Sequence, residues 1–200
     1  LANKHPLIEW HDSIDSLPQL PLLLVANEFF DALPIRQFVG TTERMVEIVD
    51  NKLSFSLDGV TSETCEPAIA IIRQLSQHIS NHSGVALIID YGDIEGSKGD
   101  TLQAMKNHAY HSILEDIGDA DLTAHVDFLT LKEAAKSEEI NVFGAIPQGA
   151  FLMRLGAGTR TTALCEISAK EHQKTLISGL KRLADPQEMG ELFKVLAITS

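Results

Sequence analysis

The stretch Leu22 to Phe38, LLLVANEFFDALPIRQF, constrains the fold of this 200-residue chain more than any other. Its first five residues, Leu22 to Ala26, are uniformly apolar and do not alternate with polar residues. Such a run is typical of a strand that is covered on both faces in a parallel sheet. The strand ends at Asn27 and Glu28, and ligands of open parallel α/β sheets bind beyond the carboxyl ends of the strands. This amide and this carboxylate are therefore candidate site residues.

The residues after this strand also have a purely structural interpretation. In it, Asn27 caps a short helix from Glu28 to Leu33, the helix dipole favours Glu28 in the first turn, and Pro34 ends the helix. The two interpretations are compatible, because a capping amide at the end of a strand still faces the crevice. Phe29 and Phe30 would point about 100° apart on a helix, so we expect one in the core and one beside a pocket.

Three later segments also bring polar side chains to the ends of predicted strands. VALIID reads as a second buried parallel strand that opens after Gly84 and ends at Asp90-Tyr91-Gly92. ADLTAHVDF reads as an extended segment that leads, through Asp127 as N-cap, into a helix over 128–137. In INVFGAIPQGAFLMRLG a strand is followed by a helix, and we expect the side chains at the start of that helix to face the crevice: Gln148 and Phe151.

The other segments complete the predicted α/β architecture. Residues 35–57 alternate apolar and polar residues, which predicts a β-meander with a hairpin turn at Asp50-Asn51. Apolar residues at spacings of three and four predict a helix over 66–80, and a further helix is expected over 169–184. Residues 93–121 are polar, with a weakly helical stretch around His108 and His111, and would form a lid or substrate loop. LFKVLAI is expected to be a buried strand that closes the sheet.

Composition excludes several classes of protein. The net charge of −12 and the pI near 5.0 argue against nucleic-acid binding, which needs a basic surface. No apolar run is long enough to span a membrane, and no signal peptide is visible. Cys65 and Cys165 are isolated, which favours a reducing compartment over a disulfide-bonded protein. His78 and His82 stand four residues apart, but no third ligand accompanies them, so we predict no metal site.

Six ordered motifs resemble one family of enzymes. ANEFFDALPIRQF, LIIDYG, GDT, ADLTAHVDF, QGAFLMRLG and MGELFKVLAI are similar to segments of the MidA-like S-adenosylmethionine-dependent methyltransferases. That family includes a mitochondrial protein-arginine methyltransferase needed for respiratory complex I assembly. The resemblance extends from about Trp10 to the end of the chain. The glycine-rich cofactor loop of the family, of the type E-x-G-x-G, is absent, so the chain resembles the second half of such an enzyme.

The resemblance implies a fold and a cofactor. The fold would be the second half of a Rossmann-like methyltransferase sheet with helices on both faces, formed by residues 1–34 and 84–200, and the cofactor would be S-adenosyl-L-methionine. Residues 35–83 would be an inserted, substrate-side meander and helix. The segment after the third strand of related enzymes lies against the adenine ring, which implicates His11 and Asp12 in cofactor binding, with Asn27 and Glu28. Capping of a turn by Asp12 is an equally simple explanation.

The resemblance also implies an arginine acceptor, and its chemistry selects further residues. A guanidinium stays charged at neutral pH, and carboxylates bind it best through paired, charge-assisted hydrogen bonds. Glu28 and Asp31, three residues apart, are therefore the leading acceptor-binding candidates. His125 would accept the proton after transfer, unless it is an ordinary packed histidine. The other candidates for substrate binding are Phe29, Asp90, Tyr91, Asp127, Gln148 and Phe151.

Two functions from different classes follow. The first is protein-arginine methylation of a complex I subunit or a similar protein, in the bacterial cytoplasm or the mitochondrial matrix. The second is an assembly or binding module of the same fold without turnover, since the chain alone lacks the glycine-rich loop and would be inactive. A dinucleotide-dependent oxidoreductase has only the open sheet in its favour. The strand Leu22 to Ala26 would also present an unpaired apolar edge, which invites pairing with another chain, including a second copy.

Overall fold

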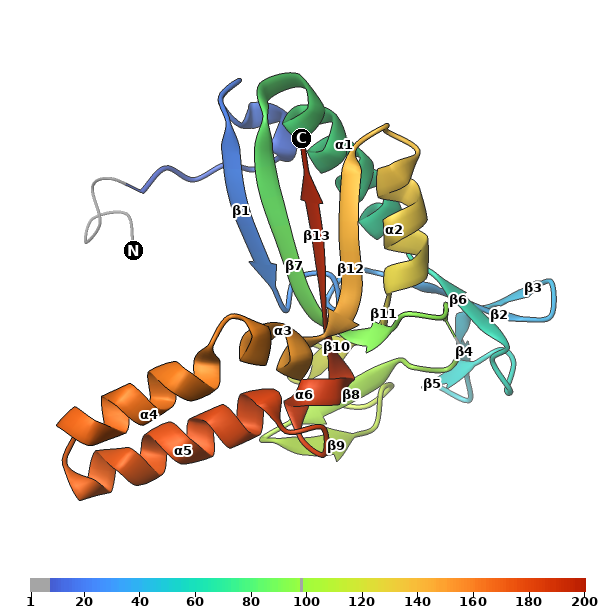
Figure 1. Ribbon diagram of the computed structural model, residues 1–200. Helices are drawn as coiled ribbons and strands as arrows, with labels where there is room; N and C mark the ends of the chain where they lie inside the picture. The colour runs from blue at the N-terminus through green and yellow to red at the C-terminus, as the bar shows by residue number, and fades with distance from the viewer. Residues whose placement is uncertain (1–7, 98) are drawn as a thin grey trace.

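A mixed sheet forms the centre of the molecule, for which a computed structural model describes residues 8–97 and 99–200 (Figure 1). The strand order is β1-β7-β13-β12, with bounds Leu22–Asn27, Gly84–Asp93, Phe193–Thr199 and Asn141–Pro147. The two-residue strand β11 (Val126–Asp127) also pairs with β7. β1 and β7 are parallel, from Leu22 opposite Gly84 to Asn27 opposite Ile89. β13 is antiparallel to both of its neighbours. The predicted last strand therefore lies inside the sheet and does not close it.

Two helices cover one face of this sheet and form the core with it. They are α1 (Glu66–His82) and α2 (Phe128–Lys136), which also pack on each other. Ile72 and Ile79 of α1 are 0% exposed, as is Phe128 at the start of α2. Each fully buried side chain of this size contributes roughly 1.5–3 kcal/mol to folding. Both helices match their predicted positions, because their apolar residues recur with the helical period.

The opposite face of the sheet is open in the described residues, contrary to the prediction of helices on both faces. Leu23 and Val25 of β1 are 86% and 68% exposed, and Phe143 of β12 is 62% exposed. Residues of β1 alternate between half-buried and exposed, so only one face of this apolar strand is covered. Among the described residues β1 pairs with β7 alone, so it is the predicted edge strand, and the pairing of this edge with a further chain stays a prediction.

Residues 36–64 form small sheets beside the carboxyl edge of the central sheet. β2 (Arg36–Val39) pairs with β3 (Thr42–Arg44) and β6 (Ser62–Thr64), and β4 (Val46–Val49) pairs with β5 (Lys52–Phe55). The predicted turn lies between β4 and β5, where Asp50 and Asn51 have φ of 49° and 62°. Asn and Asp tolerate this left-handed region better than most residues. The segment is thus two small sheets and not one continuous meander.

Residues 103–123 form a third small sheet where a weak helix was predicted. β8 (Gln103–Lys106) is its central strand, between β10 (Asp121–Thr123) and β9 (Ala109–His111). His108 lies in the turn between β8 and β9 with φ of 62°, and His111 belongs to β9. The helical prediction was wrong because pairing among these strands outweighs a weak local preference for helix.

Four helices lie between β12 and β13. They are the short α3 (Gln148–Arg154), α4 (Ala157–Ile167), α5 (Lys170–Ala184) and the short α6 (Met189–Leu192). A separate 3₁₀ turn, η2 (Ile14–Ser16), lies near the N-terminus, before β1. α5 was predicted, but α4 was not, because its sequence AGTRTTALCEI has no clear apolar stripe. α4 and α5 form a hairpin that projects away from the sheet (Figure 1).

Candidate functional site

The turn after β1 carries the first candidate residues. Asn27 is the last residue of β1, and Glu28 follows with φ of 49°, so the chain leaves the strand in a left-handed turn and not in the predicted helix. The Asn27 amide donates to Glu28 Oε1 over 3.2 Å, and both side chains are exposed. Phe29 is 47% exposed whereas Phe30 is 3% exposed. One ring therefore lies in the core as expected, but the ring that lines the described cavity is that same Phe30, and Phe29 is not among the lining residues.

Asp90 of β7 holds this turn in place. Its side chain is 0% exposed, and Oδ2 accepts from the backbone N–H groups of Phe29, Phe30 and Asp31 at 3.2, 3.0 and 3.3 Å. Oδ1 accepts from the N–H of Tyr91 at 3.0 Å. These bonds occupy most of the acceptor capacity of the carboxylate. Asp90 is therefore a structural anchor of the turn, and the geometry leaves it little capacity for the predicted contact with substrate.

The environment of Asp90 opposes its ionisation. Burial and the nearby carboxylate of Asp31 raise the pKa of Asp90 to about 7, although the N–H groups of Tyr91, Asp31 and Phe30 act in the opposite direction. A charged carboxylate loses hydration when it is buried, and a like charge adds to that cost. The protonation of Asp90 therefore changes near neutral pH.

Asp31 has a buried carboxylate oxygen without a hydrogen-bond partner. Among the described residues, no other carboxylate at this edge of the sheet has such an oxygen. The residue is 6% exposed, and its Oδ2 accepts from the hydroxyl of Tyr91 at 2.8 Å. Its Oδ1 is buried and has no partner. Leaving a buried acceptor unpaired costs roughly 1–3 kcal/mol, so such an oxygen calls for a donor. We name Asn27, Glu28, Asp31, Asp90 and Tyr91 the carboxyl-edge site.

Tyr91 connects Asp31 to the surrounding aromatic residues. Its ring lies edge to face with those of His125 and Phe193, at centroid distances of 5.6 and 5.5 Å. Burial raises the pKa of the Tyr91 hydroxyl, which remains a neutral donor at physiological pH. The main chain of Asp31 is tied to the same region, because its carbonyl accepts from the N–H of Ala124 at 3.0 Å. The structure thus brings His125 next to the carboxyl-edge site.

A second network, which the sequence analysis did not identify, supports the segment that carries His125. Glu63 of β6 is 9% exposed and accepts from the Thr101 N–H and hydroxyl at 2.8 and 2.6 Å. Thr101 Oγ1 in turn accepts from the His125 N–H at 3.0 Å. Gln37 also donates to Glu63 at 2.7 Å. Thr101 is the last residue of the GDT motif, which could have pointed to this network in the sequence. Its partner Glu63 lies in the three-residue strand β6, which has no recognisable motif.

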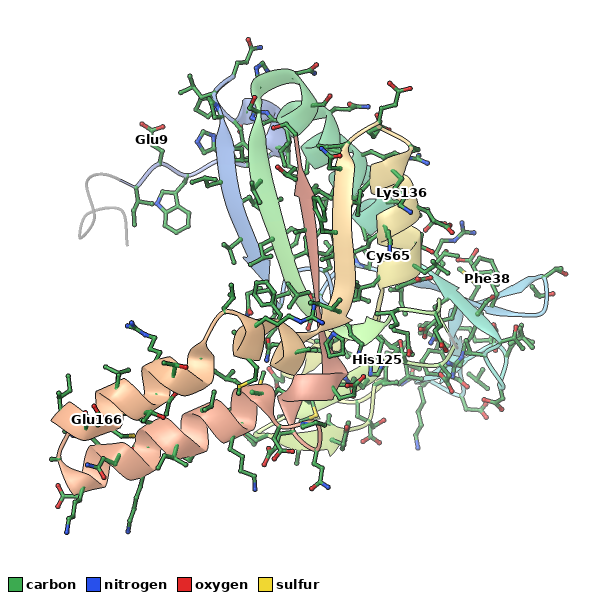
Figure 2. All side chains as sticks on the ribbon, in the orientation of Figure 1. Glu9, Phe38, Cys65, His125, Lys136 and Glu166 are labelled. Carbon is green, nitrogen blue, oxygen red and sulfur yellow. The ribbon has the colours of Figure 1, made fainter. Side chains whose placement is uncertain are left out.

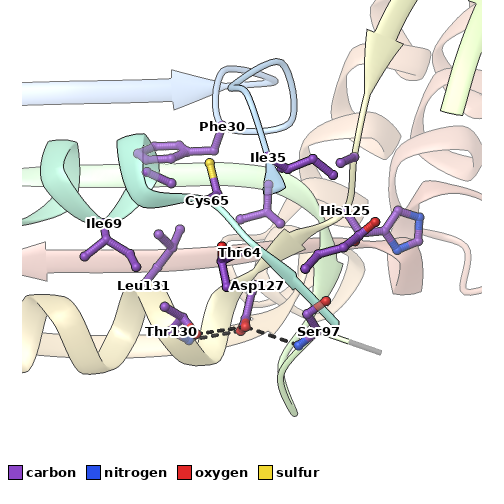
Figure 3. A pocket seen from close by; sticks show the side chains of 14 residues that line it. Phe30, Ile35, Thr64, Cys65, Ile69, Ser97, His125, Asp127, Thr130 and Leu131 are labelled. Carbon is purple, nitrogen blue, oxygen red and sulfur yellow. Dashed lines mark hydrogen bonds between the residues drawn. The ribbon is translucent and has the colours of Figure 1, made fainter. Parts of the chain in front are cut away.

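Asp127 caps α2. Its Oδ1 accepts from the N–H of Thr130 at 3.0 Å, and its Oδ2 accepts from the Thr130 hydroxyl at 2.8 Å and the Ser97 N–H at 3.2 Å (Figure 3). This confirms the predicted N-cap. These three bonds also explain the side chain without any role in substrate binding, which stays a prediction.

Replacing Asp127 with alanine is expected to lower the free energy of unfolding by about 1–2 kcal/mol, because the first turn of α2 loses its cap and the Ser97 N–H loses its acceptor. Urea denaturation measures this difference, and Asp127→Asn should lose less. If the alanine variant kept full stability but lost affinity for an acceptor protein, Asp127 would be a binding residue and not a cap.

The remaining candidates lie away from the carboxyl-edge site or are engaged elsewhere. Gln148 is 6% exposed and donates to the carbonyl of Leu183 at 2.9 Å, so it anchors α5, while Phe151 is half-buried on α3. His11 contacts the hydroxyl of Ser16 in η2, and η2 packs on α1. Asp12 is exposed beside it. The structure does not join His11 and Asp12 to Asn27, and their role in adenine binding stays a prediction.

A cavity of about 80 Å³ lies behind the turn, between the first turns of α1 and α2 (Figure 3). Apolar side chains supply much of its wall: Phe30, Ile35, Ile69, Val126 and Leu131. Cys65, which precedes α1, also lines it, and burial raises the pKa of this thiol. The thiol is therefore a poor nucleophile at neutral pH.

Residues 8–97 and 99–200, the part of the chain that the structure describes, were searched for metal-binding groups and membrane-spanning helices. No group of three His, Cys, Asp or Glu side chains there is arranged to hold a metal ion. No helix there has the length and apolarity that crossing a membrane requires. His78 and His82 lie with ring centroids 4.9 Å apart, without a third ligand.

The sequence matches a known family over most of its length. The family is described as "Putative S-adenosyl-L-methionine-dependent methyltransferase", and the matches cover residues 2–58 and 48–146. "Protein arginine methyltransferase NDUFAF7, mitochondrial" of Xenopus laevis is 34% identical over 94% of this chain and 48% of its own length. The human protein of that name is 32% identical over 96% and 48%. The chain spans about half the length of these curated relatives.

Two crystal structures of proteins from Burkholderia thailandensis have the same fold. Both align with the whole of this chain, at 26% sequence identity and TM-scores of 0.80 and 0.79, and the chain covers 61% and 59% of them. The second is a superfamily member bound to S-adenosyl-homocysteine, the demethylated product of S-adenosylmethionine. The mixed α/β architecture of this chain is therefore shared with a protein that binds S-adenosyl-homocysteine.

Proposed function

Because the chain belongs to this S-adenosyl-L-methionine-dependent methyltransferase family, we propose that the full-length protein methylates an arginine side chain of another protein. The observation that carries the proposal is the buried, unpartnered Oδ1 of Asp31 at the carboxyl edge of the sheet. A guanidinium supplies the donors that such an oxygen lacks, and it remains charged when it is bound. The names of the curated relatives support the same acceptor.

The sheet fits the second half of a Rossmann-like methyltransferase fold in this proposal. Residues 1–34 and 84–200 would belong to the core, with 1–7 and 98 outside the described residues, and residues 35–83 would be a substrate-side insertion whose helix α1 also packs on the sheet. The chain lacks the E-x-G-x-G loop of the family, so we expect residues 1–200 alone to be inactive.

Acceptor binding would depend on Asp31 and Glu28. One N–H of the guanidinium would donate to Asp31 Oδ1, and Glu28, whose carboxylate is exposed and already oriented by Asn27, would bind a second N–H from outside. Because Asp31 Oδ1 is closed off from solvent, an entering side chain must displace part of its cover. Tyr91 would keep the carboxylate of Asp31 in one orientation while this occurs.

The transfer itself needs orientation more than chemical participation. The cofactor supplies an electrophilic methyl group, and in-line displacement is fast when the acceptor nitrogen is held against it. Carboxylates at this edge also suit the sulfonium cation, which is the part of the cofactor next to the reaction. The nitrogen loses a proton after transfer, and His125, whose ring lies against Tyr91, is the proposed proton acceptor.

The partner and the compartment follow from the family in this proposal. The acceptor would be a subunit of respiratory complex I or a similar protein, and the curated relatives carry the word mitochondrial in their names. We therefore expect the mitochondrial matrix for a eukaryotic protein and the cytoplasm for a bacterial one. The open edge of β1 is compatible with pairing with a further chain.

Transfer of radioactive methyl groups from S-adenosylmethionine to candidate acceptor proteins tests the proposal. Full-length protein should label arginine, and Glu28→Gln should lower kcat/KM about 10–100-fold, since a charge-assisted hydrogen bond contributes roughly 1.5–3 kcal/mol. Glu47→Gln is the matched control, because Glu47 is an exposed residue of β4 outside the carboxyl-edge site, and it should retain full activity.

The same assay separates enzyme from binding module. Labelling that survives Glu28→Gln unchanged would remove Glu28 from the site. Complete absence of labelling by the full-length protein, with its acceptor bound, would favour a module without turnover.

A further inference from the structure

The hairpin of α4 and α5, residues 157–184, differs in charge from the rest of the molecule. This helical arm holds five Lys and Arg residues and two Glu residues, a formal charge of +3. The whole chain carries −12, so the remaining residues carry −15. The net charge therefore differs in sign between the arm and the body, and the arm projects away from the body (Figure 2).

The cations of the arm differ from those of the body in their ion pairing within the described residues. In the body, Arg36 pairs with Glu43, Arg44 with Asp100 and Lys106 with Asp116. Among residues 8–97 and 99–200, none of the arm cations takes part in an ion pair, and all five are exposed: Arg160, Lys170, Lys174, Lys181 and Arg182. They remain available to an external partner.

Three of these lysines form one row on α5. Lys174 and Lys181 follow Lys170 by 4 and 11 residues, which places all three within about 40° around the helix and over a length of about 17 Å. Ile177, seven residues after Lys170, lies in the same row and is 58% exposed. We name these four residues the lysine row.

Contacts between helices and hydrogen bonds at the turn stabilise the arm. No residue of α4 or α5 is buried, so the hairpin depends on contacts within itself and with α3 and α6. The amide of Gln173 donates to the carbonyls of Cys165 and Ser168, both at 2.9 Å, which satisfies acceptors at the end of α4. The turn between the helices is therefore fixed, and the lysine row is a preformed surface.

We infer that the lysine row is a docking surface for an acidic face of a partner protein. That face of the partner would carry a row of carboxylates about 17 Å long with one apolar side chain among them. Complementary charge steers such a partner and fixes its register, and Ile177 provides an apolar contact at the centre. A membrane is disfavoured, because the row offers one apolar side chain while the body is strongly anionic. Nucleic acid is disfavoured, because the row contains neither Arg nor an aromatic residue.

The position of the arm relates this surface to the carboxyl-edge site. β12 runs parallel to β7, and its last residue, Pro147, is paired with Lys194, which in turn is opposite Asp90. α3 begins directly after Pro147 and leads into the arm. A protein held by the lysine row would thus be close to the edge of the sheet that carries Asp31. The inference itself stands without the proposed activity.

Binding of a labelled helical peptide to the full-length protein tests the inference. The 18-residue peptide presents glutamates along one face with a leucine among them, and fluorescence anisotropy is measured at low and at physiological salt. The triple variant Lys170→Glu, Lys174→Glu, Lys181→Glu should bind at least tenfold more weakly. The matched control reverses three exposed cations of the body: Lys52→Glu, Arg73→Glu and Lys136→Glu. It has the same net charge and should change affinity less than twofold.

Ile177→Ala gives the second measurement. It should weaken binding of the leucine peptide but leave that of a peptide with alanine at the same position unchanged. Equal losses in the two triple variants would show a net-charge effect and overturn the inference, as would absence of binding. Stronger binding to vesicles with 30% phosphatidylserine, or to single-stranded DNA, than to the peptide would overturn it as well.

Discussion

Asp31→Asn in the full-length protein is expected to lower kcat/KM for arginine methylation about a hundredfold or more. Asparagine has the same shape, and its oxygen can still accept the Tyr91 hydroxyl that Asp31 Oδ2 accepts over 2.8 Å. Its NH₂ group, however, would take the place of the unpartnered Oδ1 and face the guanidinium with donors. Removing one partner of a buried, hydrogen-bonded charge pair costs roughly 2–5 kcal/mol.

Two controls make this result specific. Tyr91→Phe removes the hydroxyl that orients Asp31 but keeps the carboxylate, so it should reduce activity less than Asp31→Asn does. Affinity for S-adenosyl-homocysteine, measured by calorimetry, should be unchanged in Asp31→Asn. Equal loss of cofactor affinity and activity would mean that Asp31 acts on the cofactor or on the fold, and not on the acceptor.

The second large effect concerns Asp90 and pH. Its pKa is about 7 in the folded protein, whereas an unfolded aspartate titrates near its ordinary value of about 3.9. Between these two values the folded state binds more protons than the unfolded state, so stability falls as the pH rises. From pH 5 to pH 8, Asp90 should therefore lower the free energy of unfolding by about 3 kcal/mol.

Urea denaturation at pH 5 and pH 8 measures this contribution as the difference between the wild type and Asp90→Asn. The variant should lose about 3 kcal/mol less than the wild type over this interval. Glu43→Gln is the matched control: Arg36 lowers the pKa of Glu43, so that group stays ionised from pH 5 to pH 8 and its removal should leave the pH dependence unchanged. Identical pH dependence in the wild type and Asp90→Asn would contradict the raised pKa.

An NMR titration of the Asp90 carboxyl carbon in the wild type gives the same information if Asp90→Asn does not fold. A midpoint near 7 is expected, and a midpoint below 4 would show that the four N–H groups around the carboxylate outweigh its burial.

The sequence predicted the elements that have a strong period or a clear capping residue. α1 lies where its apolar spacing placed it, α2 begins after its predicted cap Asp127, and α5 lies where a helix was expected. The two parallel strands β1 and β7 were predicted from two apolar runs, and the structure pairs them with each other. Local pattern determines such features, because each is stabilised by residues close in sequence or by burial of one stripe.

Other features depend on contacts that no local pattern records. The turn at Glu28 is left-handed, and not helical, because Asp90, some sixty residues later, accepts three successive N–H groups from it. β13 is inserted between β7 and β12, an order set by the whole fold. The uniform apolar run of β1 predicted cover on two faces, but one face is exposed in the described residues.

Part of the candidate site was predicted from the sequence, and part depends on contacts between distant residues. Asn27, Glu28, Asp31 and Tyr91 do lie at one edge, because parallel strands bring their carboxyl ends together. Asp90 anchors the turn, and its predicted contact with substrate stays a prediction. Glu63 could not be predicted, since its importance depends on Thr101, which lies 38 residues away in sequence.

A crystal structure of the full-length protein with S-adenosyl-homocysteine and an arginine peptide from its acceptor tests the central claim most directly. A guanidinium nitrogen should lie about 2.7–2.9 Å from Asp31 Oδ1, with Tyr91 still bound to Oδ2. A guanidinium bound elsewhere next to the cofactor, with Asp31 Oδ1 still without a donor, would contradict the account.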